Sequence, residues 1–280
     1  MSNPLGYENK HVVVSGCYSG MGEATARRLL DLGAEVHGLD YKDCTLDLAS
    51  FNHVDLRDPA SIDAAVQKIG EKTGGKVDAL FNCAGLPQIF PPVEVMKVNY
   101  IGARHLAERI VPLMSEGGAI ANVASTAGRG WPGRIPLCRE LIDQPDYAGA
   151  AAWCEANMDP AAQGYSFSKE VMIVWTLLTS SQLIKRGIRI NCTMPGPTQT
   201  PMMPAFEAGS SPAVVNASTQ PIGRRATAEE QAGPLVFLNS DQASYVNGVA
   251  FPVDGGLTGG LAMGQIDMSA AMAAVKATTR

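Results

Sequence analysis

The sequence predicts an α/β fold with a single doubly wound parallel sheet and helices on both of its faces. Two observations predict it. Short apolar runs alternate with segments of helical periodicity along the chain, which is typical of parallel strands joined by right-handed crossover helices. The first apolar run, at residues 11–14, leads through a glycine-rich turn at residues 16–22 into the first helical segment.

Composition indicates one large domain. The chain has 280 residues, of which 46% are hydrophobic, so it can bury a sizeable core. No break in composition divides it. We expect residues 1–258 to form the domain and residues 259–280 to form a C-terminal tail.

Charge and hydropathy argue against several classes of protein. The net charge is −5 and the basic residues are scattered, unlike the footprint of a nucleic-acid-binding protein. The chain has no run of about 18 apolar residues, the minimum for a membrane helix. Its first ten residues lack the apolar core of a signal peptide. We therefore expect a cytoplasmic protein that binds neither nucleic acid nor membrane.

Cysteines and histidines give no sign of a metal centre. The six cysteines lie far apart without a C-x-x-C pair, and we interpret them as reduced, mostly buried residues. The four histidines have no partners at metal spacing, so no chemistry is assigned to them. These residues are Cys17, Cys44, Cys83, Cys138, Cys154, Cys192, His11, His37, His53 and His105.

The first half of the chain alternates strand and helix. Strands are expected at residues 11–14, 36–40, 51–56 and 77–85, and helices at 23–30, 59–69 and 93–111. The second helix has apolar residues at helical spacing, with Pro59 and Ser61 at its start. Asp55 closes the third strand, and the third helix ends before Pro112.

The second half continues the pattern. Strands are expected at residues 118–125, 188–194 and 249–256, and helices at 165–185 and 228–238. Pro252 within the last strand predicts a sheet edge or a bulge. The tail carries a loose helical stripe of Ile266, Met268, Met272 and Val275. It either crosses a subunit interface or covers the site, with disorder as the alternative.

The glycine-rich turn has the spacing G-x-x-x-G-x-G, set by Gly16, Gly20 and Gly22. Glycines suit a strand that reverses tightly into a helix and a backbone that approaches a pyrophosphate at the helix N-terminus. Such a turn is also found as plain structure, so by itself it leaves both interpretations open. The next apolar run ends in Asp40, where a ribose 2′-hydroxyl would be bound. Together the two features predict a dinucleotide-binding Rossmann fold.

Charge favours NAD over NADP. The carboxylate of Asp40 would repel a 2′-phosphate and accept hydrogen bonds from the ribose hydroxyls. None of Ser15, Cys17 and Tyr41 supplies the cation that a 2′-phosphate requires. The alternative for Asp40 is a turn residue after a strand.

Tyr165 and Lys169 lie four residues apart, hence on one face of a helix. A neighbouring ammonium favours the phenolate, so we expect Lys169 to lower the pKa of Tyr165 and let it exchange a proton with a carbonyl or hydroxyl oxygen. The alternative is an ordinary surface pair. Ser125 ends a predicted strand at the edge where open α/β sheets bind ligands, and its hydroxyl could hold a developing oxyanion. The alternative for Ser125 is a helix or turn cap.

Seven short motifs give the chain a resemblance to the short-chain dehydrogenase/reductase family. They are Gly16-x-x-x-Gly20-x-Gly22, Asn82-Cys83-Ala84-Gly85, Val98-Asn99, Val123-Ala124-Ser125-Thr126-Ala127-Gly128, Tyr165-x-x-x-Lys169, Pro195-Gly196-x-x-x-Thr200 and Val253-Asp254-Gly255-Gly256. They lie in order within residues 11–257. The resemblance implies a reaction in which hydride passes between a substrate carbon and the nicotinamide of NAD, while the protein supplies orientation and electrostatics.

The resemblance also implies the role of each site residue. Tyr165 would be the general acid/base, Lys169 would lower its pKa and hold the nicotinamide ribose, and Ser125 would bind the substrate oxygen. Asn99 would anchor a water-linked proton relay to Lys169. The implied cofactor contacts are Gly16, Tyr18, Ser19, Gly20, Met21 and Gly22 at the pyrophosphate, Asp40 at the ribose hydroxyls, Asp55 and Leu56 near the adenine, and Asn82, Ala84 and Gly85 at the adenosine ribose. Tyr165 and Lys169 would lie at the nicotinamide end, and Pro195, Gly196, Thr198 and Thr200 toward the carboxamide and phosphates.

Ser125 and Tyr165 are farther apart than is usual in the family, which places an insertion at residues 129–164. Its prolines predict that the insertion is divided into short segments, one of them a short helix over residues 146–157. An insertion here resembles the subgroup of bacterial 3α-hydroxysteroid dehydrogenase/carbonyl reductase. Trp131 and Trp153 either line a large apolar substrate site or attach the insertion to the body of the protein.

Residues 201–210 are apolar at first and then break into glycine and serine, a pattern typical of a mobile lid over the cofactor. Met202, Met203 and Phe206 favour an apolar alcohol or ketone, although methionines also fill cores.

We therefore predict an NAD-dependent oxidoreductase that interconverts a secondary alcohol and a ketone, with an apolar cyclic, steroid-like or aromatic substrate. One alternative is a dehydrogenase of a small polar hydroxy compound or an acyl thioester. Another is a non-catalytic NAD-binding regulator, which the presence of all four catalytic residues disfavours.

We also expect a homo-oligomer. Phe167 stands where the family usually has a small residue, on a helix that often meets a neighbouring subunit. Together with the insertion this puts the usual tetramer interface in doubt and favours a dimer through the other side.

Overall fold

The computed structural model contains one parallel sheet of seven strands in the order β3-β2-β1-β4-β5-β6-β7. The strands are β1 (His11–Ser15), β2 (Glu35–Asp40), β3 (Ser50–His53), β4 (Val77–Asn82), β5 (Met114–Val123), β6 (Arg189–Pro195) and β7 (Ala250–Val253). The structure describes residues 5–157, 159, 164–210 and 212–269. Strand order runs outward from β1 in both directions, so the predicted doubly wound Rossmann fold is confirmed.

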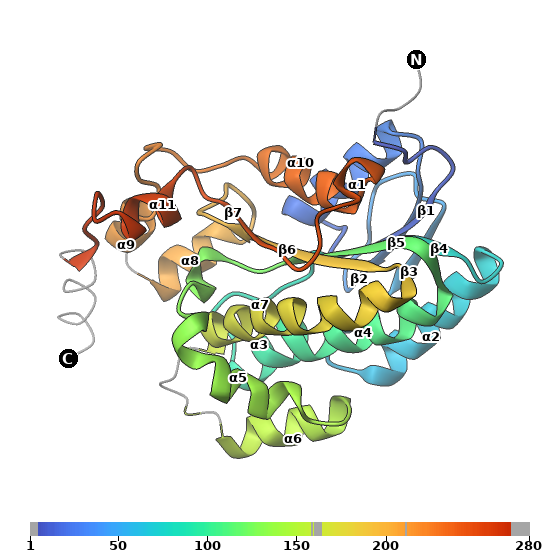
Figure 1. Ribbon diagram of the computed structural model, residues 1–280, viewed down its shortest axis with the longest axis horizontal. Coiled ribbons are helices and arrows are strands. Elements are labelled where there is room, and N and C mark those ends of the chain that lie inside the picture. The colour runs from blue at the N-terminus through green and yellow to red at the C-terminus, as the bar shows by residue number, and fades with distance from the viewer. Residues whose placement is uncertain (1–4, 158, 160–163, 211, 270–280) are drawn as a thin grey trace.

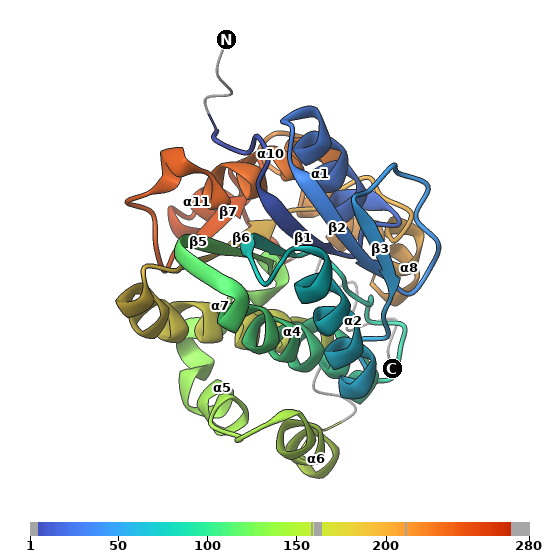
Figure 2. The same cartoon turned by 90° about the vertical axis from the view of Figure 1, so that its right-hand side faces the viewer.

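Helices cover both faces of the sheet (Figure 1). One face carries α1 (Gly20–Asp31) and α10 (Ala228–Asn239), and the other carries α2 (Pro59–Lys72), α4 (Ala103–Ile110) and α7 (Gly164–Leu183). Figure 2 shows the same layers from the side. The remaining helices are α3 (Pro92–Met96), α5 (Ile135–Ile142), α6 (Tyr147–Asn157), α8 (Met203–Gly209), α9 (Pro212–Ala217) and α11 (Leu257–Ala262).

The core lies on both sides of the sheet because successive residues of a strand point to opposite faces. Val13, Leu80 and Ile120 belong to the larger buried cluster under α2, α4 and α7. Val12 and Phe81 belong to the cluster under α1 and α10. Strands that are buried on both faces are continuous in apolar residues, which is why the sequence marks them so clearly.

The end of the third strand differs from the prediction, whereas the edge position of the last strand agrees with it. The third strand ends at His53, so the expectation that Asp55 closes it was wrong. Asp55 instead belongs to a turn, where its carboxylate accepts hydrogen bonds from the backbone and guanidinium of Arg57. The last strand, with Pro252, pairs only with β6 and forms the sheet edge, as predicted.

The insertion forms an outer layer of two helices, α5 and α6, below α7 and α4 (Figures 1 and 2). The prediction of a short helix over residues 146–157 is confirmed by α6. Helix α5 was not predicted, since the prolines of the insertion indicated only short pieces. Pro136 is the second residue of α5, where a helix needs no backbone donor.

The tail begins as α11, and its described part packs back on the protein. Ile266 lies against Gly260, and the side chain of Met268 is buried. Met272 and Val275 of the expected stripe lie outside the described residues.

All six cysteines are free. Cys17 and Cys44 nevertheless lie together, since the Cys44 thiol donates to the Cys17 carbonyl at 3.4 Å. Among the described residues, no helix combines the length and the apolar character needed to cross a membrane.

Candidate active site

The glycine-rich turn joins β1 to α1 and lies against the end of β4. Gly16 has φ +79°, and a Cβ there would come within 2.6 Å of the Ala84 amide nitrogen. A Cβ on Gly22 would lie 2.0 Å from the Gly16 carbonyl oxygen. Both positions therefore require glycine, because the turn packs directly on the backbone at the end of β4 and on itself.

The start of α1 suits a pyrophosphate. Within the described chain, the side chain of Ser19 makes no capping hydrogen bond to α1, so the first amide groups of the helix are available to a ligand. Thr200, from the segment after β6, lies beside this turn: a Cβ on Gly20 would be 3.3 Å from the Thr200 Cβ. Met21 packs on the core below. The structure thus fits the phosphate side of a dinucleotide here.

Asp40 ends β2 and points toward the same turn. Its carboxylate accepts from the backbone amides of Tyr18 and Lys42, each at 2.9 Å. An acceptor placed next to the glycine turn fits a ribose diol. The sequence analysis overlooked Lys42, whose ammonium lies 5.1 Å from the centre of the Tyr18 ring. Lys42 is therefore a cation close to the Asp40 end of the site.

The side chains of three expected cofactor residues make contacts with other parts of the protein. Asn82 donates to the Asn122 Oδ1 at 2.9 Å and is buried. Leu56 is buried in the core, and the carboxylate of Asp55 is held by Arg57, which lowers the pKa of Asp55. The assignment of Asn82, Leu56 and Asp55 as cofactor contacts stays a prediction.

The carboxyl ends of β4 and β6 supply the small residues of the site. Gly85 lies between Asn99 and Lys169, because a Cβ on it would be 3.3 Å from the Asn99 Oδ1 and 4.0 Å from the Lys169 Nζ. Pro195 is the last residue of β6. Gly196 lies against Asp254, and its carbonyl accepts from the Thr198 hydroxyl at 2.9 Å.

Ser125, Tyr165 and Lys169 converge at the carboxyl end of β5. Ser125 follows the strand, and its hydroxyl accepts from the Ala127 amide and is hydrogen-bonded to the Tyr165 hydroxyl. Lys169, one turn along α7, donates to the Val123 carbonyl at 2.8 Å and lies 5.6 Å from the centre of the Tyr165 ring. Ser125 therefore caps a short turn and also contacts Tyr165, and its role toward a substrate oxygen stays a prediction.

Burial dominates the acid–base properties of this group. Removal from water raises the pKa of Tyr165 to about 12, and the hydrogen bond with Ser125 lowers it only in part. The same effect lowers the pKa of Lys169 to about 8. Desolvation is thus the largest effect on Tyr165 in the protein alone, and a lowering of its pKa by Lys169 stays a prediction.

Asn99 lies in a widened turn within the predicted long helix. The segment Lys97–Gly102 is a π-helix between α3 and α4, and such segments often mark functional sites. The Asn99 amide accepts from the Leu86 amide at 2.6 Å and donates to the Leu86 carbonyl and the Ser168 hydroxyl. It thereby joins the loop that contains Gly85 to the catalytic helix.

The segment after Thr200 folds over the site as α8. The rings of Phe206 and Tyr165 are in edge contact, with centroids 4.9 Å apart. Met203 is buried and Met202 partly so. Gln88, which the sequence analysis did not single out, ties α8 to the loop after β4 by donating to the Phe206 carbonyl and the Ser210 hydroxyl. No motif marks Gln88, since its partners are distant in sequence.

The insertion packs on the catalytic helix through Phe167. This ring is buried, with Trp153 6.2 Å away and the Arg134 guanidinium 4.9 Å away, both measured to its centroid. Trp131 also packs against the core. These contacts support the attachment role for the two tryptophans, and their place in a substrate site stays a prediction. Phe167 is large because the insertion covers it.

Comparisons with known proteins agree with this geometry. A family model described as short chain dehydrogenase matches residues 10–136, and one described as Enoyl-(Acyl carrier protein) reductase matches residues 151–258. The chain is 36% identical to coniferyl-alcohol dehydrogenase of Pseudomonas sp. (strain HR199 / DSM 7063), over 89% of this chain and 96% of that protein.

Two further matches are named for a 3-alpha-hydroxysteroid dehydrogenase. The chain is 30% identical to 3-alpha-hydroxysteroid dehydrogenase/carbonyl reductase of Comamonas testosteroni, over 88% of this chain and 95% of that protein. The solved structure of 3-alpha-hydroxysteroid dehydrogenase from Pseudomonas sp. B-0831 complexed with NADH superposes with a TM-score of 0.78 at 26% identity, covering 92% of this chain and 100% of that one.

Proposed function

The chain belongs to the short-chain dehydrogenase/reductase family, and we propose that it is an NAD-dependent enzyme that interconverts a secondary alcohol and a ketone on an apolar, ring-bearing substrate. The observation that carries this proposal is the convergence of Ser125, Tyr165 and Lys169 beside the glycine turn. The relatives named for coniferyl alcohol and for a hydroxysteroid support the substrate class. The aromatic contact of Phe206 with Tyr165 supports it independently.

NAD(H) supplies the hydride acceptor or donor when it is bound. The start of α1, which Ser19 leaves uncapped, would hold its phosphate groups, and Asp40 beside the glycine turn would hold its ribose. Ser125 would hold the substrate oxygen next to the Tyr165 hydroxyl. Tyr165 would take the proton of the alcohol on its phenolate oxygen during oxidation and return it to the carbonyl oxygen during reduction.

The Lys169 ammonium would stabilise the Tyr165 phenolate by its positive charge. The ammonium is fixed by the Val123 carbonyl and lies within reach of the ring. Because burial raises the pKa of Tyr165 to about 12 in the protein alone, positive charge near the ring is needed before the phenolate forms near neutral pH. Asn99 would anchor the proton relay to Lys169 through water, and this role remains our proposal.

The test is NADH formation, followed by absorbance, with a panel of cyclic, aromatic and short polar alcohols and a hydroxyacyl thioester. We expect turnover of the ring-bearing alcohols. Tyr165→Phe should abolish it and still bind NADH, as measured by fluorescence titration. Activity retained in Tyr165→Phe would refute the assigned acid/base. Turnover of only the polar alcohols or the thioester would favour the alternative substrate classes, and NADH binding without any turnover would favour a regulator.

We further propose that the enzyme is a cytoplasmic dimer whose interface does not use the insertion-covered side of α7. The packing of α5 and α6 over α7 and α4 supports this, since it covers part of that face (Figure 2). Light scattering that shows a monomer would contradict the proposal. The division into a domain at 1–258 and a tail at 259–280 also stays a prediction.

A further inference from the structure

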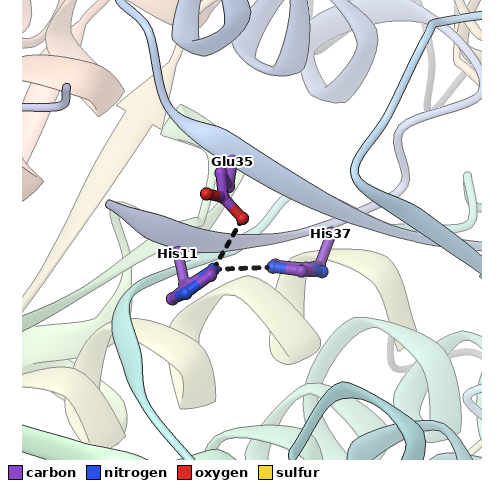
Figure 3. Close-up of side chains that lie close together, drawn as sticks. All are labelled: His11, Glu35 and His37. Carbon is purple, nitrogen blue, oxygen red and sulfur yellow. Dashed lines mark hydrogen bonds and ion pairs between the residues drawn. The ribbon is translucent and has the colours of Figure 1, made fainter. Parts of the chain in front are cut away.

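Three side chains with metal-ligand atoms meet at the end of the sheet away from the candidate active site. His11 opens β1, and Glu35 and His37 come from β2. His11 pairs in register with Glu35, and Val13 pairs with His37. Because alternate residues of a strand share a face, all three side chains leave the same side of the sheet. Figure 3 shows them pointing toward one another.

The distances between the ligand atoms match a small metal ion. The His11 Nδ1 lies 3.2 Å from the His37 Nε2 and 3.3 Å from the Glu35 Oε2. All three atoms lie within 4.8 Å of one another. Two ligands about 2.1 Å from a tetrahedral zinc ion are about 3.4 Å apart, so both His11 contacts have the length of a tetrahedral edge.

Ser50 of β3 orients one of the ligands. Its hydroxyl lies 2.7 Å from the His37 Nδ1, and the two residues pair directly in register. A hydrogen bond at one ring nitrogen fixes which nitrogen carries the lone pair, and metal-binding histidines nearly always have such a partner. With Nδ1 donating to Ser50, the lone pair of Nε2 points at the His11–Glu35 side.

The surroundings leave a route from solvent. The His11 side chain is 21% exposed and that of Glu35 51% exposed, whereas His37 is fully buried. The positive charge of Lys72, at the end of α2, acts on His37 and opposes a cation. The Glu35 carboxylate provides the compensating negative charge. Asp78, which accepts from the His11 backbone amide at 2.9 Å, holds the start of β1 in place.

We propose that His11, Glu35 and His37 bind one Zn²⁺ ion, with a fourth position open to water. Two imidazoles and a carboxylate form a ligand set that zinc uses in open sites. The ion would join β1 to β2, the two strands that lead into the glycine turn and Asp40. The expectation that His11 and His37 lack partners was wrong, because the partners meet across neighbouring strands.

The experiment uses the full chain without a histidine tag, stripped with a chelator and titrated with Zn²⁺ in competition with a chromophoric chelator. We expect one zinc ion per chain after gel filtration, measured by elemental analysis. His11→Gln should weaken binding by more than about 100-fold, and Ser50→Ala by about 10- to 100-fold, the range for a lost second-sphere partner. Glu35→Gln, a partly exposed position, should also weaken it without disturbing the fold.

His53→Gln is the matched control. His53 lies on β3 and also pairs with a carboxylate, that of Asp43 at 3.1 Å, but it belongs to no three-ligand group among the described residues. This variant should bind zinc as the wild type does. Substitution with Co²⁺ should give the visible absorption of a four-coordinate ion, absent in His11→Gln. Circular dichroism and NADH binding check that each variant is folded.

Two results would overturn the proposal. The first is a wild-type chain that keeps no zinc after gel filtration. The second is zinc binding of the same strength in folded His11→Gln and Glu35→Gln, which would place the ion elsewhere.

Discussion

Phe206 meets Tyr165 edge to face, with ring centroids 4.9 Å apart and ring planes at 74°. The two residues come from α8 and α7, and their contact brings the segment after β6 onto the proposed acid/base. The apolar ring of Phe206 thereby covers part of the Tyr165 ring, while the Lys169 ammonium lies 5.6 Å from the centre of the Tyr165 ring.

The first prediction concerns this contact. Phe206→Ala should lower kcat/KM for ring-bearing alcohols about 2- to 10-fold, because an aromatic pair contributes about 0.5–1.5 kcal/mol beyond its buried area. Phe237→Ala, on α10 and partly exposed, is the control and should leave kcat/KM unchanged. Equal kinetics for the wild type and Phe206→Ala would show that α8 does not shape the substrate site.

The second prediction concerns the buried ammonium of Lys169. Because burial lowers its pKa from 10.5 to about 8, the unfolded chain binds more protons than the folded chain between these values. The free energy of unfolding therefore gains about 1.4 kcal/mol per pH unit from this group as pH rises from 8 toward 10.5, and loses it as pH falls. Melting temperatures of the wild type and Lys169→Met at pH 7 to 10 measure the effect as their difference.

Lys185→Met, at an exposed lysine after α7, provides the control, because it removes a lysine without removing a buried ammonium. A pH-independent difference for Lys169→Met would mean that the ammonium is not desolvated as the structure indicates.

The third prediction concerns cofactor choice. Asp40→Asn should raise the NADP-to-NAD ratio of kcat/KM by about tenfold or more, since it removes a charge that would repel the 2′-phosphate. The amide keeps an oxygen to accept from the Tyr18 or Lys42 amide. Lys42→Ala in the Asp40→Asn background should reverse part of the gain, since Lys42 is the nearby cation. An unchanged ratio in Asp40→Asn would remove Asp40 from cofactor selection.

The fourth prediction concerns the insertion. Phe167→Ala should lower the free energy of unfolding by about 3–5 kcal/mol, the usual cost of a large cavity in a core. In a double-mutant cycle with Trp153→Ala, the pair should show a coupling of about 0.5–1.5 kcal/mol, as for other aromatic contacts. Denaturant unfolding of the four proteins gives both values. Strictly additive effects would mean that the insertion is not attached through these rings.

The sequence was sufficient to predict the fold and to bring together several residues of the candidate site, because both depend on local signals. Buried parallel strands are continuous in apolar residues, and Gly16, Gly22 and Asp40 lie at positions that the strand–turn–helix geometry dictates. The four-residue spacing of Tyr165 and Lys169 places them on one helix face, as observed.

The features that the sequence could not predict depend on contacts between residues that are distant along the chain. The pKa of Tyr165 is set mainly by its burial, which the four-residue spacing to Lys169 does not reveal. Gln88 and Lys42 act through partners brought close only by the folded loops. His11 and His37 meet because β1 and β2 are neighbours in a fixed register, a relationship that linear spacing conceals.

The π-helical segment Lys97–Gly102 divides one long helix into two halves of different phase. An α-helix turns by about 100° per residue, so the extra residue of a π turn rotates everything beyond it by about that angle. Side chains before the π turn and side chains after it can therefore point to different parts of the protein. Asn99 points to the loop at Leu86, while Leu106 and Ile110 point into the core. Deleting one residue in this segment would realign the two halves and withdraw the amide from the site without removing any functional side chain.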